Sequence, residues 1–160
     1  MTFQQELSSW AFPKSVTISP VPEVGSKAPS TSELSFPTSD GKPSVIAFLR
    51  HCGCPFAEKT FLGLRDLPSK DTSKNYVAVS HPSDSTTKNW LRSVGGEGNV
   101  RVIVDENESY MENGAWSGSR WQTSGSFAVC KNGTVKWVAV SKAADEVPVF
   151  GEATKALSGA

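Results

Sequence analysis

The stretch VIAFLRHCGCPFA, residues 45–57, decides the fold that we predict for this chain. It opens with an uninterrupted apolar run from Val45 to Leu49, which is typical of a strand buried on both faces of a sheet. From Cys54 onward the apolar residues take helical spacing, and Pro55 suits the first turn of a helix, where a backbone N–H is not needed. The stretch therefore predicts a buried strand that passes into a helix, with a cysteine at the junction.

Strands and helices alternate along the rest of the chain, and a hairpin and a final helix follow. Asn132-Gly133 indicates the hairpin, since Asn-Gly is the strongest short turn signal, and Asp84 or Ser85 could cap the second helix. The predicted elements, in chain order, are strand 45–49, helix 54–67, strand 76–80, helix 84–94, strand 100–104, strands 127–130 and 135–140, and helix 150–157. Alternation implies parallel strands joined by right-handed crossovers, and a hairpin adds antiparallel strands. We therefore predict an α/β, thioredoxin-like fold: a central mixed sheet flanked by helices, with one extra strand and a C-terminal hairpin plus helix.

Size and composition indicate one globular domain. The chain has 160 residues, of which 38% are hydrophobic; we assign residues 21–160 to the domain and residues 1–20 to an N-terminal extension. The 16 basic residues balance the 16 acidic ones, which argues against nucleic acid or an anionic membrane as a partner. No apolar run approaches the ~18 residues of a membrane span. Because no signal peptide is visible and the number of cysteines, 3, is odd, we expect a cytoplasmic location.

Cys54 is the predicted nucleophile. It follows a buried strand, so it should lie at the carboxyl edge of the sheet, where α/β folds place their sites. It also stands at the first turn of a helix, where unpaired N–H groups and the positive end of the helix dipole favour a thiolate over a thiol. Arg50 and His51 could add positive charge. A structural role for Cys54 fits a polar junction with Gly and Pro less well than an apolar strand interior.

Two interpretations are open for Cys52, and a structural role is predicted for Cys130. Cys52 could assist Cys54 or be oxidised with it, although a Cys-Gly-Cys ring is strained and readily reduced. It could equally be a small apolar residue that ends the strand. Cys130 is expected to be a packed thiol, too far from Cys54 to form a disulfide without rearrangement. The sequence has no Cys-x2-Cys pair and only 2 histidines, so we predict no metal site.

Further candidate residues should gather near Cys54. Arg120 could stabilise a thiolate or an oxyanion, or could be a surface arginine. His81 should emerge at the same edge as Cys54, either as a base or as an exposed loop histidine. Trp116 and Trp121 could wall an apolar substrate pocket or could belong to the packing of the core or a lid. The residues assigned to substrate contact are Pro55, Phe56, His81, Trp116, Trp121 and Gln122.

Several motifs together resemble the peroxiredoxin family (alkyl hydroperoxide reductase/thiol-specific antioxidant). The segment VGSKAP, residues 24–29, is similar to the family's approach to its first buried strand, and the hairpin around Asn132-Gly133 is similar to its last two strands. The nearest resemblance is to a fungal-type, peroxiredoxin-like branch whose junction reads Gly-Cys-Pro-x-Cys and whose hairpin follows an Arg-Trp-Gln segment. Here these motifs are residues 53–57 and 120–122. The likeness covers residues 22–157.

The resemblance implies a redox reaction at Cys54. The thiolate would attack a peroxide oxygen and become a sulfenic acid. An external thiol such as glutathione or thioredoxin, or Cys52, would then restore it, with no bound cofactor. The implied partners are a small-molecule substrate and a thiol reductant, and the resemblance is compatible with a homodimer.

Four positions depart from the family's pattern. His51 stands where the family has Thr or Ser three residues before the reactive cysteine, and Ser124 stands where it has an arginine before the hairpin. Ala57 replaces the branch's second cysteine, and Cys130 replaces an aspartate at the end of the first hairpin strand. Peroxidase activity therefore follows from the resemblance and not from these residues.

Two other functions remain open. The same fold and thiolate could carry out covalent or acid–base chemistry on a small organic substrate, such as a secondary metabolite, with no net redox change. The chain could also be a binding module that has lost catalysis. The pH dependence of alkylation at Cys54 separates the third hypothesis from the first two.

Overall fold

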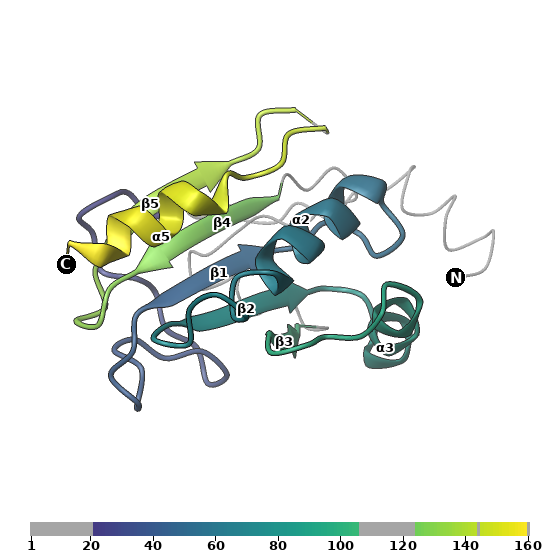
Figure 1. Cartoon of the computed structure of the whole chain (residues 1–160), viewed down its shortest axis with the longest axis horizontal. Helices are drawn as coiled ribbons and strands as arrows, with labels where there is room; N and C mark the ends of the chain where they lie inside the picture. Colours follow the sequence, from purple (N-terminus) through teal and green to yellow (C-terminus); the bar gives the residue numbers. More distant parts are fainter. Residues whose placement is uncertain (1–20, 106–123, 144, 160) are drawn as a thin grey trace, which may run out of the picture.

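The computed structural model describes residues 21–105, 124–143 and 145–159 of the chain. Within these ranges, five strands form one mixed sheet, and three helices pack around it (Figure 1). The strands are β1 (Ser44–Phe48), β2 (Asn75–Ser80), β3 (Arg101–Val104), β4 (Gly125–Val129) and β5 (Val135–Val140). The helices are α2 (Pro55–Arg65), α3 (Asp84–Ser93) and α5 (Phe150–Ser158). None of the helices in the described ranges is both long enough and apolar enough to cross a bilayer.

The order of the strands brings the ends of β1, β2 and β3 to one edge of the sheet. The order is β3-β2-β1-β4-β5; β1 pairs in parallel with β2, and β2 with β3. β4 runs antiparallel to β1, with Gly125 opposite Phe48 and Val129 opposite Ser44. The predicted mixed sheet, with its extra strand and final hairpin, is therefore confirmed.

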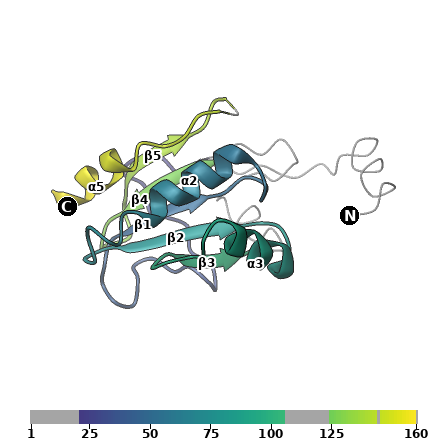
Figure 2. The ribbon, with the colours of Figure 1, turned by 45° about the vertical axis from the view of Figure 1, so that its right-hand side comes forward.

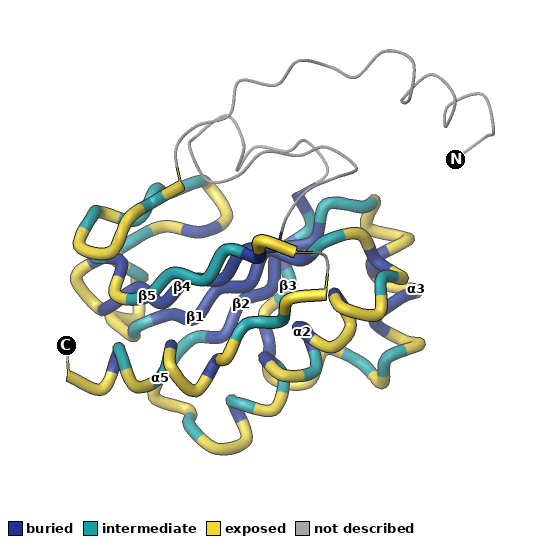
Figure 3. The backbone as a smooth tube through the Cα atoms, turned by 90° about the horizontal axis from the view of Figure 1, so that it is seen from above, coloured by how far each residue is buried: buried dark blue, intermediate teal, exposed yellow. Residues whose placement is uncertain are grey.

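The core lies on both faces of β1, which is why its five residues are all apolar or small. Val45 and Ala47 face a cluster that includes Phe61 of α2 and Phe150 of α5. The alternate residues of β1 face a second cluster on the opposite side of the sheet. Figure 2 shows α2 lying over the sheet with α5 beyond it, and α3 beside β3 and the end of β2. The tube in Figure 3 shows the central strands as the buried part of the molecule.

The helix starts agree with the predicted positions except for the cap of α3. Cys54 is the N-cap residue of α2, and Pro55 occupies its first turn. Ser83, not Asp84 or Ser85, caps α3: its hydroxyl accepts a hydrogen bond from the Thr86 N–H at 3.3 Å. The prediction was wrong because Ser83 keeps an extended backbone (φ −53°, ψ 154°) while Asp84 has already entered the helix.

The hairpin forms at the predicted Asn-Gly turn, but its first strand begins earlier than expected. Gly133 has φ of 78°, a left-handed conformation that favours glycine, and its N–H donates to the Cys130 carbonyl at 2.8 Å. Gly125 and Ser126 belong to β4 although glycine and serine are weak strand formers, because their backbones pair with β1. Tertiary pairing therefore decides where this strand begins.

Candidate functional site

The junction between β1 and α2 is a tight turn built on a glycine. The Cys54 N–H donates to the His51 carbonyl at 3.1 Å, which closes the turn His51-Cys52-Gly53-Cys54. Gly53 has φ of 92°, which a residue with a side chain rarely adopts. The chain then extends at Cys54 (φ −78°, ψ 125°) and enters the helix. The turn thus delivers Cys54 to the start of α2.

Cys54 lies at the positive end of α2. The helix has 11 residues, and its cap residue makes no side-chain hydrogen bond to the first turn. The residue is partly exposed to solvent. Unpaired N–H groups and the helix dipole favour negative charge at this point, while the Glu58 carboxylate in the first turn opposes it. The arrangement suits a reactive thiolate better than a structural thiol.

The residues around Cys54 are mostly exposed. Arg50 is partly buried, and His51 is exposed beside the turn. Pro55 is exposed, and Phe56 is 37% exposed, an apolar ring at the surface next to the cysteine. Arg120, Trp116, Trp121 and Gln122 lie outside the described residues, so the structure does not place these four predicted site residues.

Cys52 belongs to a buried polar contact rather than to the end of the strand. β1 ends at Phe48, so Cys52 does not end the strand, but it packs in the core as the small apolar residue that one of the two interpretations predicted. The residue is only 7% exposed, and its Sγ lies 3.4 Å from the Ser80 hydroxyl, at the end of β2. The Ser80 hydroxyl is 2.9 Å from that of Thr87 in α3. The thiol of Cys52, the end of β2 and helix α3 are therefore in contact beside the turn.

His81 follows β2 at the same sheet edge and packs against Asp105, which follows β3. The side chains of His81 and Asp105 are only 12% and 5% exposed, and their Nδ1 and Oδ2 atoms are 4.0 Å apart. The prediction of an exposed loop histidine is therefore wrong. Burial lowers the pKa of His81, although the charge of Asp105 and a hydrogen bond to its backbone oppose the shift. The neutral imidazole is thus the form that this environment favours.

Sequence reasoning missed Ser80, Thr87 and Asp105. The first two join the contact behind Cys52, and the third packs against His81. Ser80 carried a usable signal, since it is a polar residue at the end of an otherwise apolar buried strand. No local pattern marks Thr87 or Asp105, because their roles depend on how α3 and β3 pack beside β2.

Two of the positions that depart from the resembled family are buried in the structure. Ala57 is buried, so its side chain points into the core at the position of the branch's second cysteine. Ser124 is buried as well, and its hydroxyl is 2.7 Å from that of Ser141. A hydroxyl held in this way cannot supply the positive charge that an arginine would bring to the site.

Cys130 lies at the opposite edge of the sheet from Cys54. It follows Val129, which pairs with Ser44 at the start of β1, so the whole length of β1 separates the two edges. Its Sγ lies 2.8 Å from the Asn132 side-chain oxygen and 3.2 Å from the Thr134 carbonyl oxygen, two acceptors for its one proton. It is a packed thiol of the hairpin turn.

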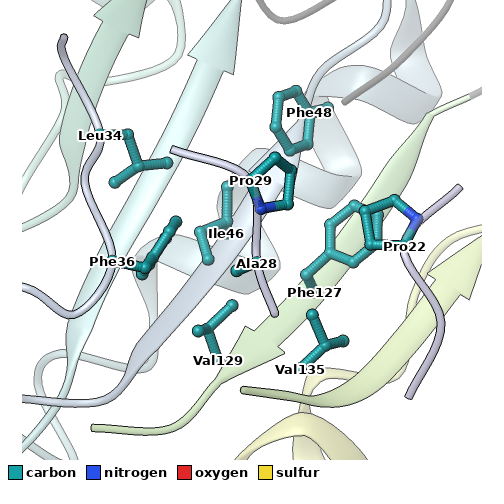
Figure 4. Close-up of a pocket in the computed structure, with 10 residues that line it drawn as sticks. All are labelled: Pro22, Ala28, Pro29, Leu34, Phe36, Ile46, Phe48, Phe127, Val129 and Val135. Carbon is teal, nitrogen blue, oxygen red and sulfur yellow. The ribbon is translucent and has the colours of Figure 1, made fainter. Parts of the chain in front are cut away.

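An apolar pocket lies on the sheet face away from α2 (Figure 4). Figure 4 shows Pro22 and Pro29 of the segment before β1 lying over side chains of β1 and β4. The pocket is lined by Pro22, Ala28, Pro29, Leu34, Phe36, Ile46, Phe48, Phe127, Val129 and Val135. Only apolar side chains line it, and Cys54 is not among them. Among the described residues, no group of three or more His, Cys, Asp or Glu side chains is arranged to hold a metal ion.

Comparison with known proteins gives a clear answer for the fold. No family model matches the sequence, and no curated protein matches it. Among solved structures, the chain is similar to a peroxiredoxin-like protein from Aquifex aeolicus, with TM-score 0.71 and 21% identity over 88% of this chain and 90% of that one. It is also similar to a thiol peroxidase from Chromobacterium violaceum, with TM-score 0.68 and 12% identity over 89% and 90% of the two chains.

A third similar structure is AhpC from Mycobacterium tuberculosis, with TM-score 0.64 and 13% identity over 88% of this chain and 93% of that one. Because all three identities are low, these likenesses establish the fold. The predicted thioredoxin-like fold of the peroxiredoxin type is confirmed. The fungal-type branch and the division at residue 20 stay predictions.

Proposed function

We propose that this protein is a thiol-dependent oxidoreductase that reduces a peroxide with the Cys54 thiolate. The observation that carries the proposal is the position of Cys54: a partly exposed cysteine at the N-cap of α2, with no side-chain hydrogen bond to the helix. The positive end of the helix stabilises the thiolate, which is the nucleophilic form. The similar structures named as a thiol peroxidase and a peroxiredoxin-like protein support the same chemistry.

The proposed reaction needs two thiol steps and no bound cofactor. The Cys54 sulfur attacks one peroxide oxygen, the O–O bond breaks, and the other oxygen leaves as an alcohol or water after taking a proton from solvent. Cys54 is left as a sulfenic acid. A thiol, either one of this chain or an external one such as glutathione or thioredoxin, then forms a disulfide with Cys54 and releases water. External thiol reduces that disulfide, restores the Cys54 thiol and is itself oxidised. A cytoplasmic location would supply such thiols.

The surroundings of Cys54 suggest modest peroxidase rates. The resemblance implies Thr or Ser at position 51 and an arginine at position 124, whereas this chain has an exposed His51 and a buried Ser124 held by Ser141. A missing donor to the developing oxyanion typically costs about 10²–10³ in rate. We therefore expect turnover well below that of a peroxidase with both groups.

Trapping of the oxidised cysteine tests the proposal. The protein is treated with hydrogen peroxide or an alkyl hydroperoxide in the presence of dimedone, and tryptic peptides are analysed by mass spectrometry. We expect adducts or disulfides at Cys54, none in Cys54→Ser, and an unchanged pattern in Cys130→Ser. Absence of any oxidation at Cys54 would refute the proposal. Alkylation of Cys54 without oxidation would instead favour non-redox chemistry on a small organic substrate.

A further inference from the structure

We propose that Cys52 is the resolving thiol for Cys54, forming a disulfide with it across Gly53. The inference rests on the proposed oxidation of Cys54 and adds the identity of the thiol that reacts first with the sulfenic acid. Three features carry it: the reach between the two cysteines, the direction of the hydrogen bonds behind Cys52, and the difference in burial of the two sulfurs.

The turn keeps the two cysteines within disulfide reach. Two residues of extended chain span at most about 7 Å between α-carbons, and a turn shortens that distance; disulfides join α-carbons about 4.4–6.8 Å apart. The Cys54 N–H bond to the His51 carbonyl closes such a turn here. A Cβ built at Gly53 would meet no atom within 4 Å outside the two neighbouring residues, so the tip of the turn is not packed against another segment. To form the bond, the Cys52 side chain must rotate away from Ser80 and toward Cys54.

The hydroxyl groups behind Cys52 form a chain whose direction follows from counting protons. The Thr87 hydroxyl donates to the Pro82 carbonyl at 3.3 Å, and a hydroxyl has only one proton to give. Thr87 must therefore accept from Ser80 across their 2.9 Å contact. Ser80, having given its proton to Thr87, can only accept from Cys52 across the 3.4 Å contact. Cys52 is thus the donor at the end of the chain, and it is held as a thiol.

Cys52 can move away from Ser80 without breaking the other hydrogen bonds of this series. When the Cys52 thiol rotates away, Ser80 still donates to Thr87, and Thr87 still donates to the Pro82 carbonyl. No buried proton loses its acceptor, and the bond that is lost is a weak S–H···O bond. Cys52 therefore lies close to Cys54 in sequence, and the only hydrogen bond described for its thiol is the weak one to Ser80.

The difference in burial decides which sulfur is oxidised first. Cys52 is only 7% exposed, whereas Cys54 is partly exposed at the helix start. An external peroxide therefore meets the Cys54 thiolate, since oxidation follows thiolate character and exposure. Cys130 cannot take the resolving role from Cys52, because it lies beyond the opposite edge of the sheet.

The proposed step balances without another reagent. A bond forms between the two sulfurs, the S–O bond of the Cys54 sulfenic acid breaks, and the hydroxyl leaves as water with the proton of Cys52. Because the Cys-Gly-Cys ring is strained, the disulfide is readily reduced. The external thiol named in the proposed function then regenerates both thiols while it is itself oxidised to a disulfide.

Peptide mapping tests this step directly, because trypsin releases both cysteines in one peptide, residues 51–59 (HCGCPFAEK). The wild-type protein, Cys52→Ser and Cys130→Ser are each treated with one equivalent of peroxide and then with dimedone. In the wild type and in Cys130→Ser we expect this peptide to have lost two hydrogen atoms and to carry little dimedone. In Cys52→Ser we expect a dimedone adduct instead, since serine keeps the hydrogen bond to Ser80 but cannot resolve the sulfenic acid. Cys52→Ala should give the same result as Cys52→Ser.

The outcomes separate this inference from the proposed function. Equal dimedone labelling of the wild type and Cys52→Ser would overturn the resolving role and leave peroxide reduction standing. A disulfide that joins Cys54 to Cys130 would also overturn it. If Cys54 is oxidised in none of the proteins, the proposed function fails and this inference fails with it.

Discussion

Gly53 sets the geometry of the site at the scale of a single residue. Its positive φ turns the chain by the amount that places Cys52 inside and Cys54 at the helix start. The reactivity that we expect of the Cys54 thiol then depends on the charges near it and on the hydrogen bond of Cys52. The helix dipole favours the thiolate, Glu58 opposes it, and the hydroxyl of Ser80 holds the proton of Cys52.

Neutralising Glu58 should make Cys54 more reactive. A carboxylate in the first turn competes with the thiolate for the positive end of α2, an effect worth about 0.3–1 kcal/mol. For Glu58→Gln we therefore expect iodoacetamide to alkylate Cys54 about two to five times faster near pH 6. Glu97→Gln is the matched control, since Glu97 lies in the loop whose Gly96 carbonyl bonds to Arg65 at the far end of α2. Equal rates for wild type and Glu58→Gln would contradict the electrostatic account.

His81 should make the protein less stable in mild acid. Burial lowers its pKa in the folded state below the unfolded value of about 6.5, so the unfolded chain binds more protons. The contribution of the neutral imidazole is complete above that value and is lost as the pH falls through the lowered folded pKa. Between about pH 7.5 and about pH 5, the urea midpoint of the wild type should fall more than that of His81→Gln. Parallel pH dependences would show that His81 does not titrate in this way.

At the scale of elements, the caps and ends of the helices place the site. Pro55 at the first turn of α2 leaves Cys54 as its cap, and Arg65 at the other end donates to the carbonyls of Val94 and Gly96 at 2.7 and 2.8 Å. The arginine therefore ties α2 to the loop after α3. The helix that carries Cys54 and the helix that carries Thr87 are held together at the end away from the site.

Removing the cap of α3 should cost stability. Ser83 satisfies an N–H of the first turn, and substitutions of this kind cost about 1 kcal/mol. We expect Ser83→Ala to lower the free energy of unfolding by about that amount in urea titrations. Ser85→Ala removes a neighbouring exposed hydroxyl and should cost clearly less. A larger loss for Ser85→Ala would show that the cap has been assigned to the wrong residue.

At the scale of the whole molecule, one core joins the helices behind the site. Phe61 of α2 is fully buried, and its ring lies 5.2 Å from that of Trp90 in α3, centre to centre. The same cluster includes Cys52 and Phe150 of α5. The hydrogen-bonded side chains of Cys52, Ser80 and Thr87 thus lie beside a packed apolar cluster. This packing holds β2 and α3 together, so that the hydroxyl groups of Ser80 and Thr87 stay in contact.

Truncating Phe61 should be the most damaging of these changes. A Phe→Ala substitution in a packed core costs about 3–5 kcal/mol, and we expect that loss for Phe61→Ala in urea unfolding. Phe56→Ala, on the same helix but 37% exposed, should cost less than about 1 kcal/mol. Similar losses for the two variants would contradict the placement of Phe61 at the centre of the core.

Local patterns predicted most of the elements but not their ends. The apolar run of β1, the Asn-Gly turn and the helical spacing after Cys54 each depend on neighbours in the sequence, and each is found in the structure. The start of β4 at Gly125 and the cap at Ser83 were missed. Backbone pairing decides the first, and the conformation of a single residue decides the second.

The position of Cys54 can be derived from the sequence, because a buried strand, a glycine turn and a helix-starting proline follow one another within a few residues. The side chains that contact Cys52 and His81 cannot be derived from the sequence in this way. Ser80 is 28 residues from Cys52, and Asp105 follows β3 whereas His81 follows the neighbouring strand β2. These contacts exist because β1, β2 and β3 align in parallel and end at one edge, and that alignment comes from packing of the whole sheet. Whether a thiol or an imidazole there is buried, and what it bonds to, follows from packing rather than from local sequence.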